Sequence, residues 1–140
     1  MTTFAVLAPL LAQVFITFLL MFGMVITRRR AVMDKQVDPK DLALRGANPW
    51  PRQAAQFGDA YQNSLELPVV FYALVIVAFV TKEADVVFVV LSWIFVLCRI
   101  VQAYVHTTSN IRKYRSLAFR GGAAVLFIML IWLTVHISLI

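Results

Sequence analysis

Four long apolar runs dominate this chain of 140 residues and restrict its fold more than any other feature. They cover residues 4–26, 61–80, 86–105 and 117–140. A helix needs about 20 residues to cross about 30 Å of hydrocarbon, and each run reaches or nearly reaches that length. The runs do not alternate between apolar and polar residues, as the strands of a membrane barrel do. We therefore expect an all-α integral membrane protein, a bundle of four transmembrane helices in a single domain.

The composition supports a membrane protein. Hydrophobic residues make up 61% of the chain and charged residues only 14%, whereas soluble domains average about half apolar and a quarter charged. The net charge of +6 would suggest nucleic-acid binding in a soluble protein, but here the basic residues flank apolar runs and do not alternate with aromatic residues. We expect the lipid bilayer as a partner and no nucleic acid. The single cysteine, Cys98, excludes an internal disulfide and a multi-cysteine metal site, and we expect no metal.

The connecting segments predict the orientation in the membrane. Basic residues concentrate in segments 27–58 and 106–116, whereas segment 81–85 contains only Lys82 and the amino terminus contains none. The positive-inside rule places the two basic segments in the cytoplasm, and the short segment and both termini outside. The first run lacks a preceding basic residue and is followed by Arg28, Arg29 and Arg30, which is the reverse of a signal peptide. We interpret it as a retained span.

Two prolines predict local features of the first loop and the second span. Asp38 and Pro39 suit the N-cap and first position of a short helix that would end at Gly46. The second helix is expected to begin near residue 51, so its first turns would project into the cytoplasm. Pro68 lies inside that helix and should kink it.

Polar residues of the second and third spans are expected to lie at matching depths. These spans are joined by a short turn. If the turn is centred between Lys82 and Glu83, two residues whose numbers sum to 165 lie at the same depth in the membrane. The level pairs are Glu66 with Arg99, Asn63 with Gln102, and Asp59 with His106. Glu66 and Arg99 lie about 16 residues from the turn, or about 25 Å, where an unpaired charge is costly. They should pair with each other or with a polar ligand, and both a register-fixing polar seam and a ligand site remain open.

A basic cluster lies between the third and fourth spans. It contains Arg112, Lys113 and Arg115, followed by Ser116. The cluster would serve as a topology determinant, or it would form an anion site in which an arginine stabilises a thiolate or a carboxylate.

The second span contains an Asn and a Glu three residues apart, followed by apolar residues, in the run from Asn63 to Tyr72. This run resembles a signature of the membrane-associated proteins in eicosanoid and glutathione metabolism (the MAPEG family). Arg99 and the pair Arg115–Ser116 follow at the spacing seen in family enzymes, and segment 38–46 is similar to their first loop. The resemblance covers nearly the whole chain and is greatest to a bacterial branch of the family.

The resemblance implies a homotrimer of four-helix subunits in a bacterial inner membrane, with glutathione as co-substrate bound between subunits near the cytoplasmic side. Carried over by position, Asn63 and Glu66 would hold the tripeptide, Arg99 would support Glu66 or the ligand, and Arg115 would stabilise the thiolate. The candidate catalytic residues are Arg115 and Ser116. The candidate cofactor-binding residues are Asn63, Glu66, Arg99, His106, Gln62 and Arg112.

Two positions depart from the family pattern and leave two functions open. Gln62 stands where family enzymes usually have an arginine, and His106 stands where they usually have a tyrosine. The first function is a glutathione-dependent transferase or peroxidase that acts on a lipophilic small molecule from the bilayer. The alternative is a non-catalytic scaffold or lipid-binding protein with the same fold.

His106 leads to a prediction about pH. A histidine that contacts the ligand would make thiol binding change with pH near its ordinary pKa of about 6.5. Isothermal titration with glutathione from pH 5 to pH 8 measures this dependence. An affinity that stays constant over that range would contradict a contact between His106 and the ligand.

Overall fold

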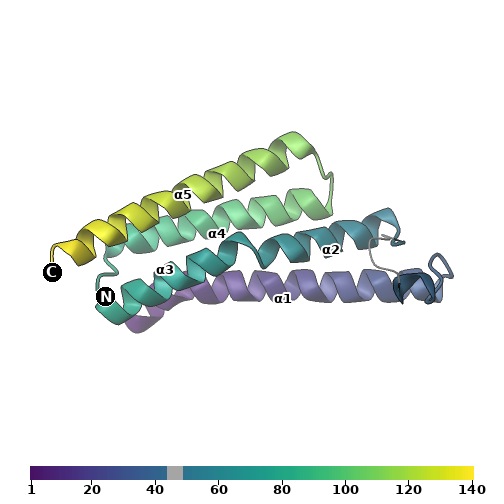
Figure 1. The fold of residues 1–140 in the computed structure, drawn as a ribbon, viewed down its shortest axis with the longest axis horizontal. Helices are drawn as coiled ribbons and strands as arrows, with labels where there is room; N and C mark the ends of the chain where they lie inside the picture. The colour runs from purple at the N-terminus through teal and green to yellow at the C-terminus, as the bar shows by residue number, and fades with distance from the viewer. Residues whose placement is uncertain (44–48) are drawn as a thin grey trace.

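The computed structural model describes residues 1–43 and 49–140, and this part of the chain is all-helical. The elements are α1 (Thr3–Met33), the 3₁₀ helix η1 (Asp41–Ala43), α2 (Arg52–Ser64), α3 (Leu67–Thr81), α4 (Val86–Thr107) and α5 (Arg112–Ser138). The long helices lie side by side, and both termini are at the same end of the bundle (Figure 1). We call this the terminal end, and we call the opposite end, with the α1–α2 and α4–α5 connections, the basic end.

Four helical stretches of the described chain are long and apolar enough to cross a membrane. They are α1, the combined stretch Arg52–Thr81, α4 and α5. This confirms the all-α class and the four-helix membrane architecture predicted from the sequence. The helices extend past the apolar runs at the basic end, where α1 continues through Arg28, Arg29 and Arg30 to Met33.

The second stretch is broken where the sequence predicts only a kink. α2 ends at Ser64 and α3 begins at Leu67, with Pro68 as its second residue. Proline has no N–H, so the carbonyl of Ser64 cannot receive the usual helical hydrogen bond. A second carbonyl near the break, that of Tyr61, accepts a hydrogen bond from the hydroxyl of Ser64 at 2.6 Å. Side chains that satisfy freed backbone groups are what makes a helix break tolerable inside a bilayer.

In the described residues the short helix predicted to begin at Pro39 is a single 3₁₀ turn, and it begins at Asp41. Asp38 Oδ1 accepts a hydrogen bond from the backbone N–H of Lys40 at 3.0 Å, which is the local turn that aspartate commonly forms. Only the short 3₁₀ helix η1 follows. Its proposed end at Gly46 lies outside the described residues.

Large aromatic side chains form the core in the terminal half of the bundle. Phe71 from α3 and Phe95 from α4 are both fully buried, and their rings stack with centroids 4.5 Å apart. Phe88 and Met129 are also fully buried in this cluster. The core therefore joins α3, α4 and α5, and it leaves the basic half for polar side chains.

α1 and α2 approach each other closely at two glycines. A Cβ added to Gly23 would lie within the van der Waals radius of the Phe57 ring, and one added to Gly58 would lie 2.9 Å from Arg28 Nη2. The Arg28 guanidinium also lies 4.8 Å from the centroid of the Trp50 ring, a favourable cation–π geometry. These contacts fix α2 against α1 at the basic end.

Asp85 links α4 and α5 at the terminal end. Its carboxylate caps α4 by accepting from the backbone N–H of Phe88 at 2.8 Å. It also accepts from Trp132 Nε1 of α5 at 3.2 Å. The Trp132 ring stacks on His136 at a centroid distance of 4.6 Å. His136 therefore belongs to the packing of this end, remote from the polar residues described next.

Candidate functional site

An open polar groove lies between α2, α4 and α5 in the basic half of the bundle. Its volume is about 310 Å³. Its lining residues are Asp59, Gln62, Asn63, Glu66, His106 and Arg115. We call this feature the polar groove. Five of these six are candidate site residues from the sequence, and the sixth, Asp59, is the predicted level partner of His106.

Two carboxylates contribute the negative charge of the polar groove. Asp59 lies on α2, and Glu66 lies in the break between α2 and α3. Both side chains are exposed in the single chain, as is Gln62. Both acids line the groove, one from α2 and one from the break that follows it. They can accept hydrogen bonds from a cationic or amide group of a ligand.

Arg115 contributes the positive charge from the opposite side. Its Nη1 donates to Asn110 Oδ1 at 2.7 Å. Asn110 has a φ of 50°, a left-handed conformation that asparagine adopts more readily than most residues. Its backbone N–H donates to the carbonyl of Val105 at 2.7 Å. The turn after α4 therefore holds the Arg115 guanidinium in place. The sequence did not indicate Asn110 as a site residue, because its spacing from Arg115 matches no motif.

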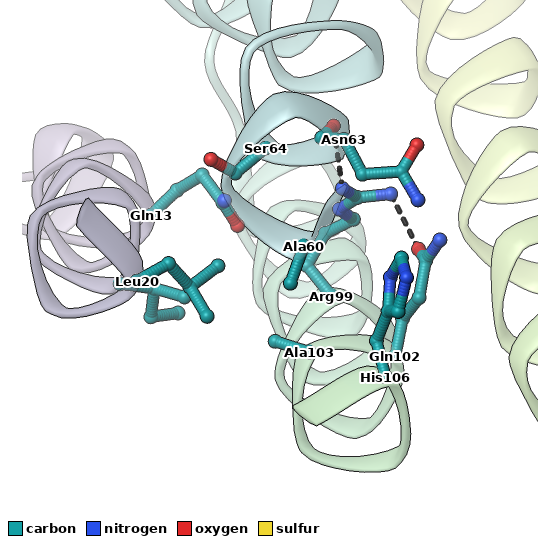
Figure 2. Close-up of a pocket in the computed structure, with 10 residues that line it drawn as sticks. Gln13, Leu20, Ala60, Asn63, Ser64, Arg99, Gln102, Ala103 and His106 are labelled. Atoms are coloured by element: carbon teal, nitrogen blue, oxygen red, sulfur yellow. Dashed lines mark hydrogen bonds between the residues drawn. The ribbon is translucent and has the colours of Figure 1, made fainter. Parts of the chain in front are cut away.

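Arg99 lies behind the polar groove and does not line it. Its side chain is 4% exposed. Nη2 donates to the backbone carbonyl of Asn63 at 2.9 Å, and Nη1 donates to Gln102 Oε1. Both hydrogen bonds are drawn in Figure 2. Within the described residues Arg99 donates no hydrogen bond to Glu66, so the direct pair expected from their equal depth is not formed. The helix break offers the guanidinium a backbone carbonyl, and Arg99 satisfies it.

Replacing Arg99 by methionine is expected to lower the free energy of unfolding by about 2 kcal/mol. The buried Gln102 Oε1 would lose its donor, at about 1–3 kcal/mol, and the part-buried carbonyl of Asn63 would keep only the longer hydrogen bond from the Glu66 N–H. The removal of a buried cation would offset part of this loss. Thermal unfolding of the purified protein in detergent measures the change. The exposed Arg120→Met is the control, since exposed arginine contacts contribute little. Equal stability of the two variants would show that Arg99 has no structural role at the break.

Two other candidate residues lie apart from the polar groove. Arg112 is the exposed first residue of α5 and is not among the groove's lining residues. Ser116 Oγ accepts from Arg120 Nη2 at 3.0 Å and from Arg120 Nε at 3.3 Å. Although Ser116 follows Arg115 in sequence, its hydroxyl is engaged on the next turn of α5.

His106 connects the groove with the interior. Its side chain is buried, at 4% exposure, yet it lines the polar groove together with Asp59 and Arg115. His106 and Asn63 also line a small cavity on the inner side. These two side chains therefore form the partition between the groove and the bundle interior.

Comparison with known proteins identifies the family. No curated protein matches the chain. The family model described as "MAPEG family" matches residues 6–135, a range that contains every residue of the polar groove. The match agrees with the four helices that are long and apolar enough to cross a membrane. The chain therefore belongs to the MAPEG family, and it is an integral membrane protein.

Proposed function

We propose that this protein is a glutathione-dependent transferase or peroxidase that acts on lipophilic substrates at the membrane. The observation that carries the proposal is the polar groove, where two exposed acids face an arginine across the gap between three helices. Membership of the MAPEG family fits glutathione-related membrane proteins of this type.

The groups in the polar groove are complementary to glutathione, which has two carboxylates, one ammonium group and one thiol. Asp59 and Glu66 would accept hydrogen bonds from the ammonium group, and the amides of Gln62 and Asn63 would bond to the peptide groups. Arg115 would lie beside the sulfur. A permanent positive charge favours the thiolate, which is the nucleophilic form of a thiol. An electrophile dissolved in the bilayer would reach this sulfur from the side of the bundle.

We also propose that the protein works as a homotrimer in a bacterial inner membrane, with its basic end in the cytoplasm. The acids of the polar groove are exposed in a single chain, so a neighbouring copy could cover them and close the site. The concentration of arginine and lysine in the connections at the basic end supports the orientation.

A non-catalytic scaffold or lipid-binding role is the second candidate. The observation in its favour is that the guanidinium of Arg99 already donates hydrogen bonds to the helix break and to Gln102. The groove then has Arg115 as its one arginine among the described residues, and a neutral amide at Gln62. Such a site would hold the carboxylates of glutathione weakly.

A thermal-shift titration with glutathione separates the two functions. A ligand selective for the native state at about ten times its Kd stabilises the protein by about 1.4 kcal/mol. We expect Tm to rise by several degrees at millimolar glutathione, and we expect a smaller rise for Glu66→Gln. Glu83→Gln is the control, because Glu83 lies in the α3–α4 turn at the terminal end. A Tm that does not change with glutathione in any of the three proteins would favour the scaffold.

A further inference from the structure

A small cavity lies between α1, α2 and α4 on the inner side of the polar groove. Its volume is about 10 Å³, which is about the volume that the centre of one water molecule requires. Its polar lining residues are Gln13, Asn63, Ser64, Arg99, Gln102 and His106. Figure 2 shows the Gln13 side chain reaching from α1 towards α2 and Arg99. The cavity therefore presents several polar side chains among apolar ones, and it is of the right size for one water.

Two buried polar atoms on this cavity lack hydrogen-bond partners in residues 1–43 and 49–140. They are Gln13 Oε1, an acceptor, and Arg99 Nε, a donor. Gln13 is 1% exposed and Arg99 is 4% exposed, so bulk solvent does not reach either group. Buried polar atoms without partners are rare because their desolvation is not compensated. One acceptor and one donor on the same cavity are what a single water molecule satisfies, since water both donates and accepts.

We propose that this cavity holds one ordered water molecule that accepts from Arg99 Nε and donates to Gln13 Oε1. A larger molecule does not fit the volume, and a cation would be repelled by the guanidinium. With the water in place all three nitrogens of Arg99 have partners: the carbonyl of Asn63, the side chain of Gln102, and the water. Gln13 then acts as a positioning residue, because it orients the arginine that satisfies the break between α2 and α3.

The proposed water would link α1 to the rear wall of the polar groove. Arg99 donates a hydrogen bond to the carbonyl of Asn63, and Asn63 lines both the small cavity and the groove. The water would connect this pair to the first helix. Neither the water nor the role of Gln13 depends on which ligand the groove binds.

Nuclear magnetic resonance on the wild-type protein with ¹⁵N-labelled arginine gives the direct test. We expect the Arg99 Nε–H to show a cross-relaxation peak with a long-lived water, and an experimental structure that resolves waters should show density between Nε and Gln13 Oε1. A cavity without density, or an Arg99 Nε–H without contact to water, would overturn the proposal.

A double-mutant cycle tests the positioning role. We expect Gln13→Met to lower Tm by about 5 °C in the wild-type background, and to change it much less in the Arg99→Met background, because the water then has no donor to bridge. Gln56→Met is the matched control. Gln56 is a second buried glutamine with an unpartnered amide nitrogen, but it does not line this cavity, so its effect should be equal in both backgrounds. Additive effects of Gln13→Met and Arg99→Met would contradict the coupling.

Discussion

Replacing Gly23 by alanine is expected to lower the Tm of the purified protein by roughly 5–10 °C, which corresponds to about 2 kcal/mol. The added Cβ would overlap the ring of Phe57 on α2. An aromatic ring is rigid, so α1 and α2 would have to move apart to make room for the methyl group. Alanine is itself a better helix former than glycine by about 1 kcal/mol, and we expect the overlap to outweigh that gain. Thermal unfolding in detergent measures the difference.

Gly121→Ala serves as the control for this prediction. Gly121 lies within α5, and a Cβ added there would be 3.7 Å from Cys98 Sγ, an ordinary van der Waals distance. This variant should be as stable as the wild type or slightly more stable. Phe57→Leu should recover part of the stability of Gly23→Ala, because it removes the ring. If Gly23→Ala were as stable as Gly121→Ala, the close approach of α1 and α2 would be wrong.

Replacing Arg115 by alanine is expected to reduce turnover with glutathione at pH 7 on the order of tenfold, because only a few per cent of a free thiol is ionised at that pH. Without the guanidinium, the pKa of the bound thiol should rise towards its free value of about 8.5. The ultraviolet absorbance of the thiolate in the complex, followed against pH, measures the shift. This result rests on the proposed function, since it requires a thiol in the polar groove.

Two variants separate the charge of Arg115 from a general effect on α5. Lys113→Ala removes an exposed positive charge two residues away, outside the polar groove, and should leave the thiolate titration unchanged. Arg115→Lys retains the charge but loses the planar guanidinium that donates to Asn110. The pKa of the bound thiol in this variant should therefore lie between the values for the wild type and Arg115→Ala. If Arg115→Ala titrates like the wild type, another group stabilises the thiolate.

The membrane-spanning helices could be predicted from the sequence because lipid permits few alternatives. A run of about 20 apolar residues that does not alternate has to satisfy its backbone internally, and a helix does so. Hydrogen bonds between side chains and a broken backbone are decided by local geometry. Pro68 indicated a distortion, yet the break at residues 65–66 depends on the partners that Ser64 and Arg99 provide for the freed carbonyls.

The polar groove could be predicted in part, because the depth of a residue in a membrane helix follows from its position in the sequence. Equal depth along two adjacent helices correctly brought Asn63, Glu66 and His106 into one region, and the family resemblance added Arg115. Depth does not specify rotation about the helix axis, so Arg99 could not be assigned to the interior and Glu66 to the groove. Gln13 lies alone in an apolar run, where no periodic pattern indicates which way a single polar residue faces.

The break between α2 and α3 has a mechanical consequence. Where the i→i+4 bonds of the helix are interrupted, the stretch Arg52–Thr81 behaves as two rods joined by a short pivot. The rod nearer the basic end bears Asp59, Gln62 and Asn63, while the other contributes Phe71 to the stacked aromatic core. No continuous ladder of helical hydrogen bonds joins the two rods, so strain imposed on the rod that lines the groove is not carried directly into the half of the bundle that maintains its shape.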